Sequence, residues 1–355
     1  MMKKLLVALL AVVMLLSMTA CSGDNTIDVS KVKAKSLMGS ADATIRWRFG
    51  TSTAPPPGHY VSGLVEFQRL VEEYTNGQMT IDIYPQSTIG GERDMIEMCG
   101  MGILDGLVCA TGPVPNFIPN VAITDFPYIF GTAEEAYAML DGEIGQFLLA
   151  QFDDLNIVGS GFWENGFRDT TNSKRPIVHP DDLKGLKIRT MENQVHMGTY
   201  NLLGATATPM AYGEVFTALN QKTIDGQENP PVIIATDKLY EAQTYLSITH
   251  LFYSPSILLY SKKSFNDLPT QELKDAVERA AKEAKDWERA YSQKSSAEGV
   301  EEMRNAGIEV NEVDIEEWRA AVQPMYENAG NYISADSVEL LAKLQAELEK
   351  YRASH

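Results

Sequence analysis

Directly after residue 43, the chain alternates short β-type segments with amphipathic helical segments. A strand is predicted from Thr44 to Phe49 and a helix from Tyr60 to Thr75, where apolar residues recur at helical spacing before Asn76-Gly77. A second strand runs from Met79 to Tyr84, a Gly-Gly turn leads into another helix, and a third strand covers 104–110. This alternation predicts an α/β fold in which a mostly parallel sheet carries helices on its faces.

A long helical pattern covers residues 270–306. Thr270 is placed to act as the N-cap, one apolar stripe follows the helix, and Gly307 ends it. At 1.5 Å per residue such a helix is on the order of 50 Å long, enough to brace two lobes and flex at their joint. The stretch Ser292–Ser296 leaves a second interpretation open, in which two consecutive helices meet at a break near Ser295.

The N-terminus has the pattern of a secretion signal over residues 1–20. Two lysines precede an unbroken apolar run, Leu5–Leu16, which is shorter than the roughly 20 residues that span a bilayer. Small residues before Cys21 resemble a bacterial lipobox, so we predict cleavage before this cysteine and a lipid on its sulfur. An ordinary signal followed by an incidental cysteine is the alternative. The polar stretch over 21–43 is predicted to be a flexible tether.

Charge and cysteine usage narrow the classes of ligand. The formal net charge of −18 argues against nucleic acid as a partner, because that binding rests on clustered lysine and arginine. An anionic ligand must therefore be held by a local arrangement that opposes the field of the whole molecule. Cys99 and Cys109 are predicted to be buried free thiols, with a disulfide as the alternative.

The sequence lacks the common motifs of catalysis and cofactor binding. It has no G-x-S-x-G, H-E-x-x-H or G-x-x-x-x-G-K-[ST] motif, and its histidines show no metal-ligand spacing. The glycines at 100, 102 and 106 follow a predicted helix at the wrong spacing for dinucleotide binding. We therefore predict no cofactor, no metal and no enzymatic activity. A catalytic pair of carboxylates is left open, because acidic residues are numerous.

Two arginines and two amides fall in one stretch of the chain. Arg168 follows the strand predicted at Leu155–Phe162, so we expect it at a strand's carboxyl end, where open α/β sheets bind ligands. Arg189 lies in a short predicted strand before a helix, and Gln227 and Asn229 follow in D-G-Q-E-N-P-P. Because arginine holds a carboxylate by two parallel hydrogen bonds, this set predicts a receptor for a small anion.

Several segments, taken in order, resemble the solute-binding proteins of tripartite ATP-independent periplasmic (TRAP) transporters, the DctP family. They extend over most of the chain and comprise I-G-G-E-R-D-M-I-E, D-F-P-Y-I-F-G-T, W-E-N-G-F-R-D-T-T-N, D-L-K-G-L-K-I-R-T, Thr208-Pro209-Met210 and I-D-G-Q-E-N-P. The resemblance implies a two-lobed, hinged fold of the periplasmic-binding-protein type, with the long helix spanning both lobes. We place lobe I at 44–165 and 254–294, and lobe II at 166–253 and 295–350.

The resemblance also implies which residues hold a ligand. The arginine of the family's G-L-K-x-R motif clamps the ligand carboxylate, and Arg189 occupies that position. Arg168 matches the family's second basic contact, and Asn229 matches a donor to the same carboxylate. Tyr212, in P-M-A-Y, matches an aromatic residue that lies against the ligand.

Four further residues are assigned to the site. Glu92, after the Gly-Gly turn, is expected to accept hydrogen bonds from ligand hydroxyls. Ser52 and Thr111 are expected nearby at strand ends, and Trp163 begins the W-E-N-G-F-R segment. Glu92 would repel a second carboxylate, which favours sugar acids such as uronates or aldonates over dicarboxylates. A C4-dicarboxylate or another 2-hydroxy or keto acid remains the alternative, since Arg168 could hold a distal carboxylate.

The family's partners complete the expectation. The resemblance implies delivery of the ligand to TRAP membrane permease subunits, by a monomer that stands outside the cytoplasmic membrane. Lipidated Cys21 would anchor it to the outer face of that membrane. Two other classes stay open, a secreted enzyme that acts on a small acid and a surface sensor with the same lobes.

Overall fold

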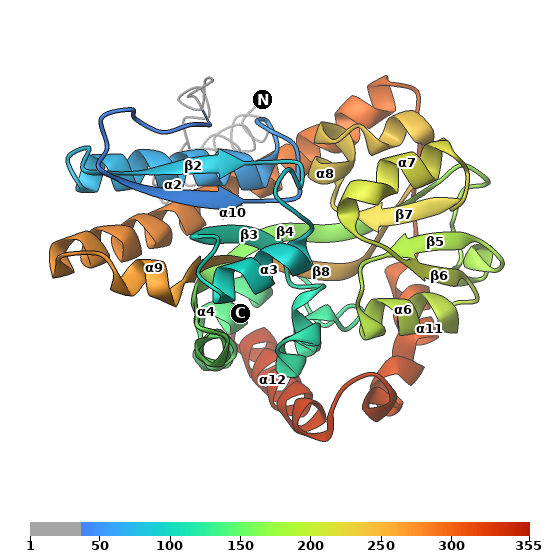
Figure 1. Ribbon diagram of the computed structural model, residues 1–355. Coiled ribbons are helices and arrows are strands. Elements are labelled where there is room, and N and C mark those ends of the chain that lie inside the picture. Colours follow the sequence, from blue (N-terminus) through green and yellow to red (C-terminus); the bar gives the residue numbers. More distant parts are fainter. Residues whose placement is uncertain (1–36) are drawn as a thin grey trace, which may run out of the picture. The chain divides into compact units, whose positions relative to one another are not determined.

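The computed structural model describes residues 37–355, so the predicted signal peptide and Cys21 lie outside the described residues. The described chain forms one mixed sheet of nine strands with helices packed on it (Figure 1). In spatial order the strands are β2 (Met79–Tyr84), β1 (Ile45–Gly50), β3 (Gly106–Ala110), β8 (Tyr245–Ser261), β4 (Ile157–Asn172), β7 (Gly226–Asn229), β5 (Lys187–Thr190) and β6 (Thr206–Pro209), and β9 (Glu309–Glu312) pairs with β8.

The sheet has two halves joined by two long strands. The neighbours β2, β1 and β3 are parallel, and so are β7, β5 and β6. The long strands β8 and β4 run antiparallel to each other and to their other neighbours β3 and β7. The α/β class is thus confirmed, but the sheet is mixed instead of mostly parallel, because β4 and β8 each continue from one half into the other.

Strand β4 is much longer than the sequence pattern indicated. Its apolar part ends at Phe162, but the strand continues to Asn172, so Arg168 lies inside β4 and does not follow its end. The continuation is polar and still buried, because β8 and then β7 pair with it. Gly161 and Gly166, with φ of 155° and 120°, sit at two of the irregular steps in the pairing with β8.

The helices cover both faces of the sheet. They are α2 (His59–Tyr74), α3 (Glu92–Gly100), α4 (Ala133–Asp141), α5 (Glu143–Ala150), α6 (Gln194–Leu202), α7 (Val215–Asn220), α8 (Pro231–Thr236), α9 (Lys262–Asn266), α10 (Gln271–Asn305), α11 (Ile315–Glu327) and α12 (Ala335–Ser354). Successive residues of β3 show the two faces, since Leu107 and Cys109 join a core that includes α3, and Val108 joins a core with α2 and α10.

Helix α10 is continuous over 35 residues and connects the two halves. Thr270 caps it by accepting a hydrogen bond from the amide of Leu273, as predicted. The helix runs unbroken through Ser292–Ser296, so the alternative of two consecutive helices is wrong. It packs against α2 in the first half, crosses β4, and packs against α8 in the second half (Figure 1). Gly299 permits close approach there, since a Cβ would lie 2.9 Å from the Pro231 carbonyl oxygen.

Two segments are placed differently from expectation. Residues 37–43, predicted as the end of the tether, lie along the sheet edge, where Leu37 accepts a 2.8 Å hydrogen bond from the Ile83 amide and Gly39 donates to Asp82. The C-terminal helix α12 packs against α4 and the 3₁₀ segment Pro119–Asp125, although residues up to 350 were assigned to the other lobe. The lobe boundaries themselves stay a prediction.

Both described cysteines are free thiols, as predicted. Cys99, on α3, and Cys109, on β3, are fully buried in the same hydrophobic core. Burial raises the pKa of each thiol, so both stay protonated and unreactive. They therefore serve packing in this part of the chain.

Candidate ligand-binding site

A small cavity lies between the two halves of the sheet, with an empty volume of about 270 Å³. The first half contributes Ser52, Thr53, Tyr60, Glu92 and Ala110. Strand β4 and the second half contribute Asn165, Arg168, Arg189, Met191, Tyr212, Asn229 and Ile233. Six of the residues assigned from the sequence thus meet at one cavity, namely Ser52, Glu92, Arg168, Arg189, Tyr212 and Asn229.

The sheet explains why distant parts of the sequence converge here. Strands β4, β7 and β5 are neighbours, with Asp169 opposite Asn229 and Arg189 opposite Gln227. Arg168 and Arg189 therefore approach the cavity from strands that flank β7. On the other side, Glu92 is the first residue of α3, a position that the helix dipole favours for an acid.

Arg189 is almost fully buried and only partly bonded. Its side chain is 2 % exposed, and both Nε and Nη2 donate to the carbonyl oxygen of Met210, at 3.1 and 2.8 Å. Its Nη1 is buried without a hydrogen-bond partner, and the guanidinium lies 5.9 Å from the ring centre of Tyr212. Burial and the nearby Arg168 lower the pKa of Arg189 to about 10, so it keeps its charge at neutral pH.

Arg168 is held by a carboxylate that the sequence analysis did not assign to the site. Nη2 of Arg168 donates to Glu228 Oε1 at 3.0 Å and to the Glu228 carbonyl at 2.7 Å, and Nε donates to Oε2. Both side chains are buried. Burial alone would raise the pKa of Glu228, but the charge of Arg168 and a bond from His196 lower it to about 2. Nη1 of Arg168 is buried without a partner, like that of Arg189.

Asn229 connects Arg168, the partner of Glu228, to Gln227 on the same strand as Asn229. Its Oδ1 accepts a 3.0 Å hydrogen bond from Arg168 Nη2, and its Nδ2 donates to Gln227 Oε1 at 2.5 Å. Gln227 in turn donates to the hydroxyl of Thr171. The amide of Asn229 therefore orients Arg168 and has one Nδ2 hydrogen left for another acceptor.

Glu92 presents one carboxylate oxygen to the cavity. Its Oε1 accepts hydrogen bonds from the hydroxyl of Ser52 and the amide of Ala110, both at 3.1 Å. Within residues 37–355, its Oε2 has no hydrogen-bond partner. Burial raises the pKa of Glu92, and these two bonds and the arginines oppose that rise. Such an oxygen is an acceptor suited to a hydroxyl group.

Asp237 connects the two sides of the cavity. It lies just after α8 and accepts a 2.8 Å hydrogen bond from the amide of Ala54, in the loop after β1. The hydroxyl of Tyr212 donates to its other oxygen. Burial raises the pKa of Asp237 to about 6. The structure therefore has a direct hydrogen bond between the two halves, next to Tyr212 of the cavity lining.

Three polar groups at or beside the cavity were not predicted from the sequence. Tyr60 and Asn165 line it, and the Tyr60 hydroxyl and Asn165 Oδ1 are buried without partners. Glu228 lies behind it on Arg168. Asn165 and Glu228 stand inside the W-E-N-G-F-R and D-G-Q-E-N motifs, so the motifs carried a signal for them. No motif pointed to Tyr60, because it is one of the buried residues of the amphipathic helix α2 and fits that pattern as a core residue.

Two assigned residues lie outside the cavity lining. Thr111 is buried and donates toward Asp125 and the carbonyl of Pro255. Trp163 is 1 % exposed and packs in the core of the first half, where its ring would meet a Cβ on Gly63 at 2.5 Å. Asn165, two positions further along β4, lies within the irregular step between Glu164 and Gly166. The regular alternation of faces is therefore broken between Trp163 and Asn165, and only Asn165 lines the cavity.

The chain was compared with known families and structures. Residues 49–331 match DctP, the bacterial extracellular solute-binding protein family 7. The chain belongs to this family. A solute-binding protein of Verminephrobacter eiseniae is 38 % identical over 287 residues, which cover 81 % of this chain and 85 % of the relative.

Two solved TRAP-family structures share the fold. A periplasmic solute-binding protein from Polaromonas sp. JS666, bound to D-erythronate, is 38 % identical with a TM-score of 0.81, covering 85 % of this chain and 98 % of that one. The sugar acid binding protein DctPAm from Advenella mimigardefordensis, in complex with galactonate, is 32 % identical with a TM-score of 0.82, covering 86 % and 99 %. The expected TRAP solute-binding protein, with its two-lobed α/β architecture, is thereby confirmed.

Two features are absent from residues 37–355 of this DctP-family chain. No helix in that range is both long and apolar enough to cross a membrane. The same range contains no group of three or more histidine, cysteine or acidic side chains arranged to hold a metal ion.

Proposed function

We propose that this chain captures a small hydroxylated monocarboxylic acid, an aldonate or uronate, and delivers it unchanged to a TRAP permease. The observation that carries the proposal is the pair of buried guanidinium donors, Nη1 of Arg168 and of Arg189, which have no partner and line one cavity. A buried donor left unpaired costs about 1–3 kcal/mol, and a carboxylate in the cavity would satisfy both.

The charges around the cavity favour one carboxylate over two. Glu228 already offsets the charge of Arg168, so Arg189 supplies the charge available to a ligand. Glu92 places a carboxylate oxygen at the same cavity, which suits hydroxyl donors and would repel a second anionic group. The two solved relatives hold D-erythronate and galactonate, each a monoacid with several hydroxyls. A C4-dicarboxylate is therefore the second choice.

Capture would proceed by closure of the lobes. The hydrogen bond from the Ala54 amide to Asp237 joins the two halves, and residues of both halves line the cavity, so their separation and closure would release and enclose a ligand. We also propose that the chain is a monomer, that it is not an enzyme, and that Cys21 carries a lipid that anchors it outside the cytoplasmic membrane. The lobe boundaries given above are part of this proposal.

The test is a panel of acids measured by thermal shift and then by titration calorimetry. Aldonates and uronates are expected to raise the melting temperature in proportion to the logarithm of their concentration, and succinate to do so less. Ligand recovered after long incubation should be chemically unchanged. Stronger binding of succinate than of any hydroxylated monoacid would contradict the ligand class, and turnover of the bound acid would contradict the transport role.

A further inference from the structure

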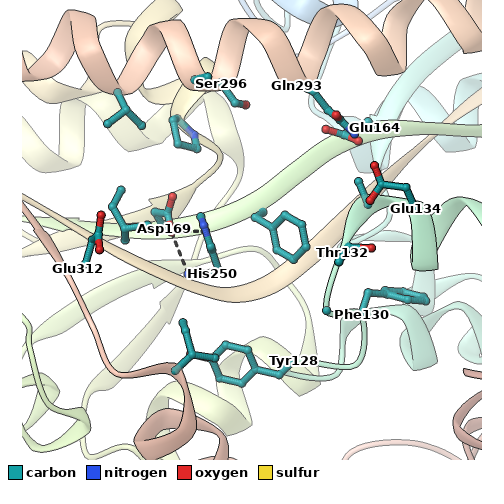
Figure 2. Close-up of a pocket in the computed structure, with 18 of the residues that line it drawn as sticks. Tyr128, Phe130, Thr132, Glu134, Glu164, Asp169, His250, Gln293, Ser296 and Glu312 are labelled. Carbon is teal, nitrogen blue, oxygen red and sulfur yellow. Dashed lines mark hydrogen bonds and ion pairs between the residues drawn. The ribbon is translucent and has the colours of Figure 1, made fainter. Parts of the chain in front are cut away.

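A second and larger cavity lies on the other side of strand β4, away from the ligand cavity. Its empty volume, part of it open to solvent, is about 1610 Å³. Figure 2 shows α10 above it and the two long strands crossing beside it, with Tyr128, Phe130 and Thr132 on the opposite wall. We call it the hinge pocket, because strands and a helix that belong to both halves of the sheet line it.

The two cavities share strand β4 and receive alternate side chains from it. Arg168 lines the ligand cavity, and its neighbours Phe167 and Asp169 line the hinge pocket. Likewise, Asn165 lines the ligand cavity and its neighbour Glu164 lines the hinge pocket. None of the residues that line the hinge pocket lines the ligand cavity, so this space is separate from the site described above.

The hinge pocket is acidic, and its basic groups are already paired. Arg304 forms an ion pair with Glu301, and Arg319 forms one with Glu316 at 3.5 Å, in which the buried Nε of Arg319 makes no hydrogen bond. His250, the only histidine that lines this pocket, lies 3.0 Å from Asp169. The cationic side chains at the pocket therefore each have a carboxylate partner.

Three carboxylates of the same lining have no such partner. Within the described chain, Glu134, Glu164 and Glu312 form no ion pair with any lysine, arginine or histidine. Glu164 instead accepts hydrogen bonds from the hydroxyls of Tyr137 and Tyr253. Glu134 and Glu312 are exposed at the rim, and Glu164 is only 3 % exposed. Figure 2 shows Glu134 and Glu164 on one side of the pocket and Glu312 on the other.

A fourth carboxylate is buried with one oxygen free. Asp169 is 0 % exposed, and its Oδ1 accepts a 2.8 Å hydrogen bond from the amide of His250. Its Oδ2 is buried with no hydrogen-bond partner. A buried acceptor without a donor is costly, and a donor entering the pocket would satisfy it. This observation is independent of the acidic rim and points to a ligand that donates hydrogen bonds.

Aromatic side chains supply the remaining chemistry. Tyr128, Phe130 and Phe167 line the pocket, and the Tyr128 ring already has the guanidinium of Arg319 5.5 Å from its centre. Aromatic faces attract cations and also bury apolar groups. We propose that the hinge pocket binds a small organic cation, an ammonium group carried on an apolar or aromatic body, with its charge toward the unpaired carboxylates.

The test uses benzylammonium as the probe, titrated into the full protein without any acid ligand. Saturable binding is expected by calorimetry, and benzyl alcohol, its neutral counterpart of similar size, is expected to bind far more weakly. Spermidine provides a second cation without a ring. Equal binding of benzyl alcohol, or no saturable signal for either cation at millimolar concentration, would overturn the proposal.

Variants locate the site. The rim pair Glu134→Gln with Glu312→Gln is expected to lower the benzylammonium affinity about fivefold, since each exposed carboxylate contributes modestly. The matched pair Glu327→Gln with Glu339→Gln, also exposed and without ion pairs, should leave it unchanged. An equal loss in both pairs would mean general attraction to an acidic protein and would overturn the site.

Two controls keep the result interpretable. Far-ultraviolet circular dichroism and the melting temperature establish that the rim variant is folded, and its exposed positions make that outcome expected. A tetralysine peptide separates a free cation from a basic protein partner. If the peptide binds through Glu134 and Glu312 and neither small cation does, the proposal of a small-molecule site is wrong. Failure of the proposed transport function would leave these measurements unaffected.

Discussion

Arg168 and Arg189 reach the same cavity with the same donor, Nη1, left unpaired, but their charges are balanced differently. The charge of Arg168 is offset by Glu228 at the back of the site, whereas among residues 37–355 the guanidinium of Arg189 donates hydrogen bonds only to the carbonyl of Met210. Arg189 therefore provides most of the electrostatic attraction for an anion. Arg168 provides a fixed, oriented hydrogen-bond donor.

The first prediction concerns Arg189. Arg189→Ala is expected to reduce the affinity for the acid that binds best by about 2–5 kcal/mol, or roughly 1.5 to 3.5 decades, because it removes the charge and a buried donor. Arg189→Lys should recover only part of the loss, since an ammonium cannot form the two parallel bonds. Titration calorimetry measures both, with exposed Arg279→Ala as the control. A loss below threefold in Arg189→Ala would contradict the clamp.

The second prediction separates stability from binding at Arg168. Arg168→Met is expected to destabilise the protein by about 3–5 kcal/mol, because Glu228 would remain buried without its partner. Adding Glu228→Gln should restore most of the stability and leave ligand binding impaired, since the Nη1 donor is still absent. Urea unfolding and calorimetry on the parent, on Arg168→Met and on the double variant measure this. A double variant no more stable than Arg168→Met would show that the ion pair does not carry the effect.

The third prediction is a pH dependence that arises at Asp237. Burial raises the pKa of Asp237 from 3.8 to about 6, so the folded protein holds this proton more tightly than the unfolded chain. Its contribution to stability is then largest below pH about 4, falls as the pH rises to about 6, and is constant above. Asp237→Asn should remove this dependence, so the variant gains about 2–3 kcal/mol relative to the parent between pH 4 and pH 7.

Unfolding by urea at several pH values measures the Asp237 effect. The parent minus variant difference is the quantity of interest, because other groups titrate in both proteins alike. Asp286→Asn, at an exposed aspartate, serves as the control for loss of a carboxyl group at the surface. A difference for Asp237→Asn that does not change with pH would refute the raised pKa.

The fourth prediction concerns the contact of α10 with α8. Alanine normally stabilises a helix by about 1 kcal/mol relative to glycine. At Gly299, however, the new Cβ would lie 2.9 Å from the Pro231 carbonyl oxygen and 3.2 Å from the Ala235 Cβ. Gly299→Ala should therefore destabilise the protein by about 1–2 kcal/mol. Gly330→Ala, with nothing within 4 Å, should change stability little; the opposite ranking in thermal unfolding would contradict this packing.

Local patterns predicted many elements closely. Strand β2 matches its predicted range, Arg189 lies in a short strand before a helix as predicted, α2 differs by one residue at each end, and α10 begins at its predicted cap. These elements have strong apolar periods and clear end signals, and such information lies within a few neighbouring residues. The predicted range of the long strand β4 was too short, because the second part of this strand is polar. That part is buried only because β7 and β8 lie beside it.

At the candidate site, too, some features follow from the sequence and others only from the tertiary structure. The residue types and motifs by themselves identified the family. They also singled out Arg168, Arg189, Glu92, Tyr212 and Asn229, all of which line the cavity. Only the tertiary structure decided that Glu228 offsets the charge of Arg168, that Trp163 packs in the core instead of lining the cavity, and that Asp237 reaches Ala54. The physical reason is that a motif specifies which groups are available, whereas the balance of charge and burial at each group depends on neighbours far away in sequence.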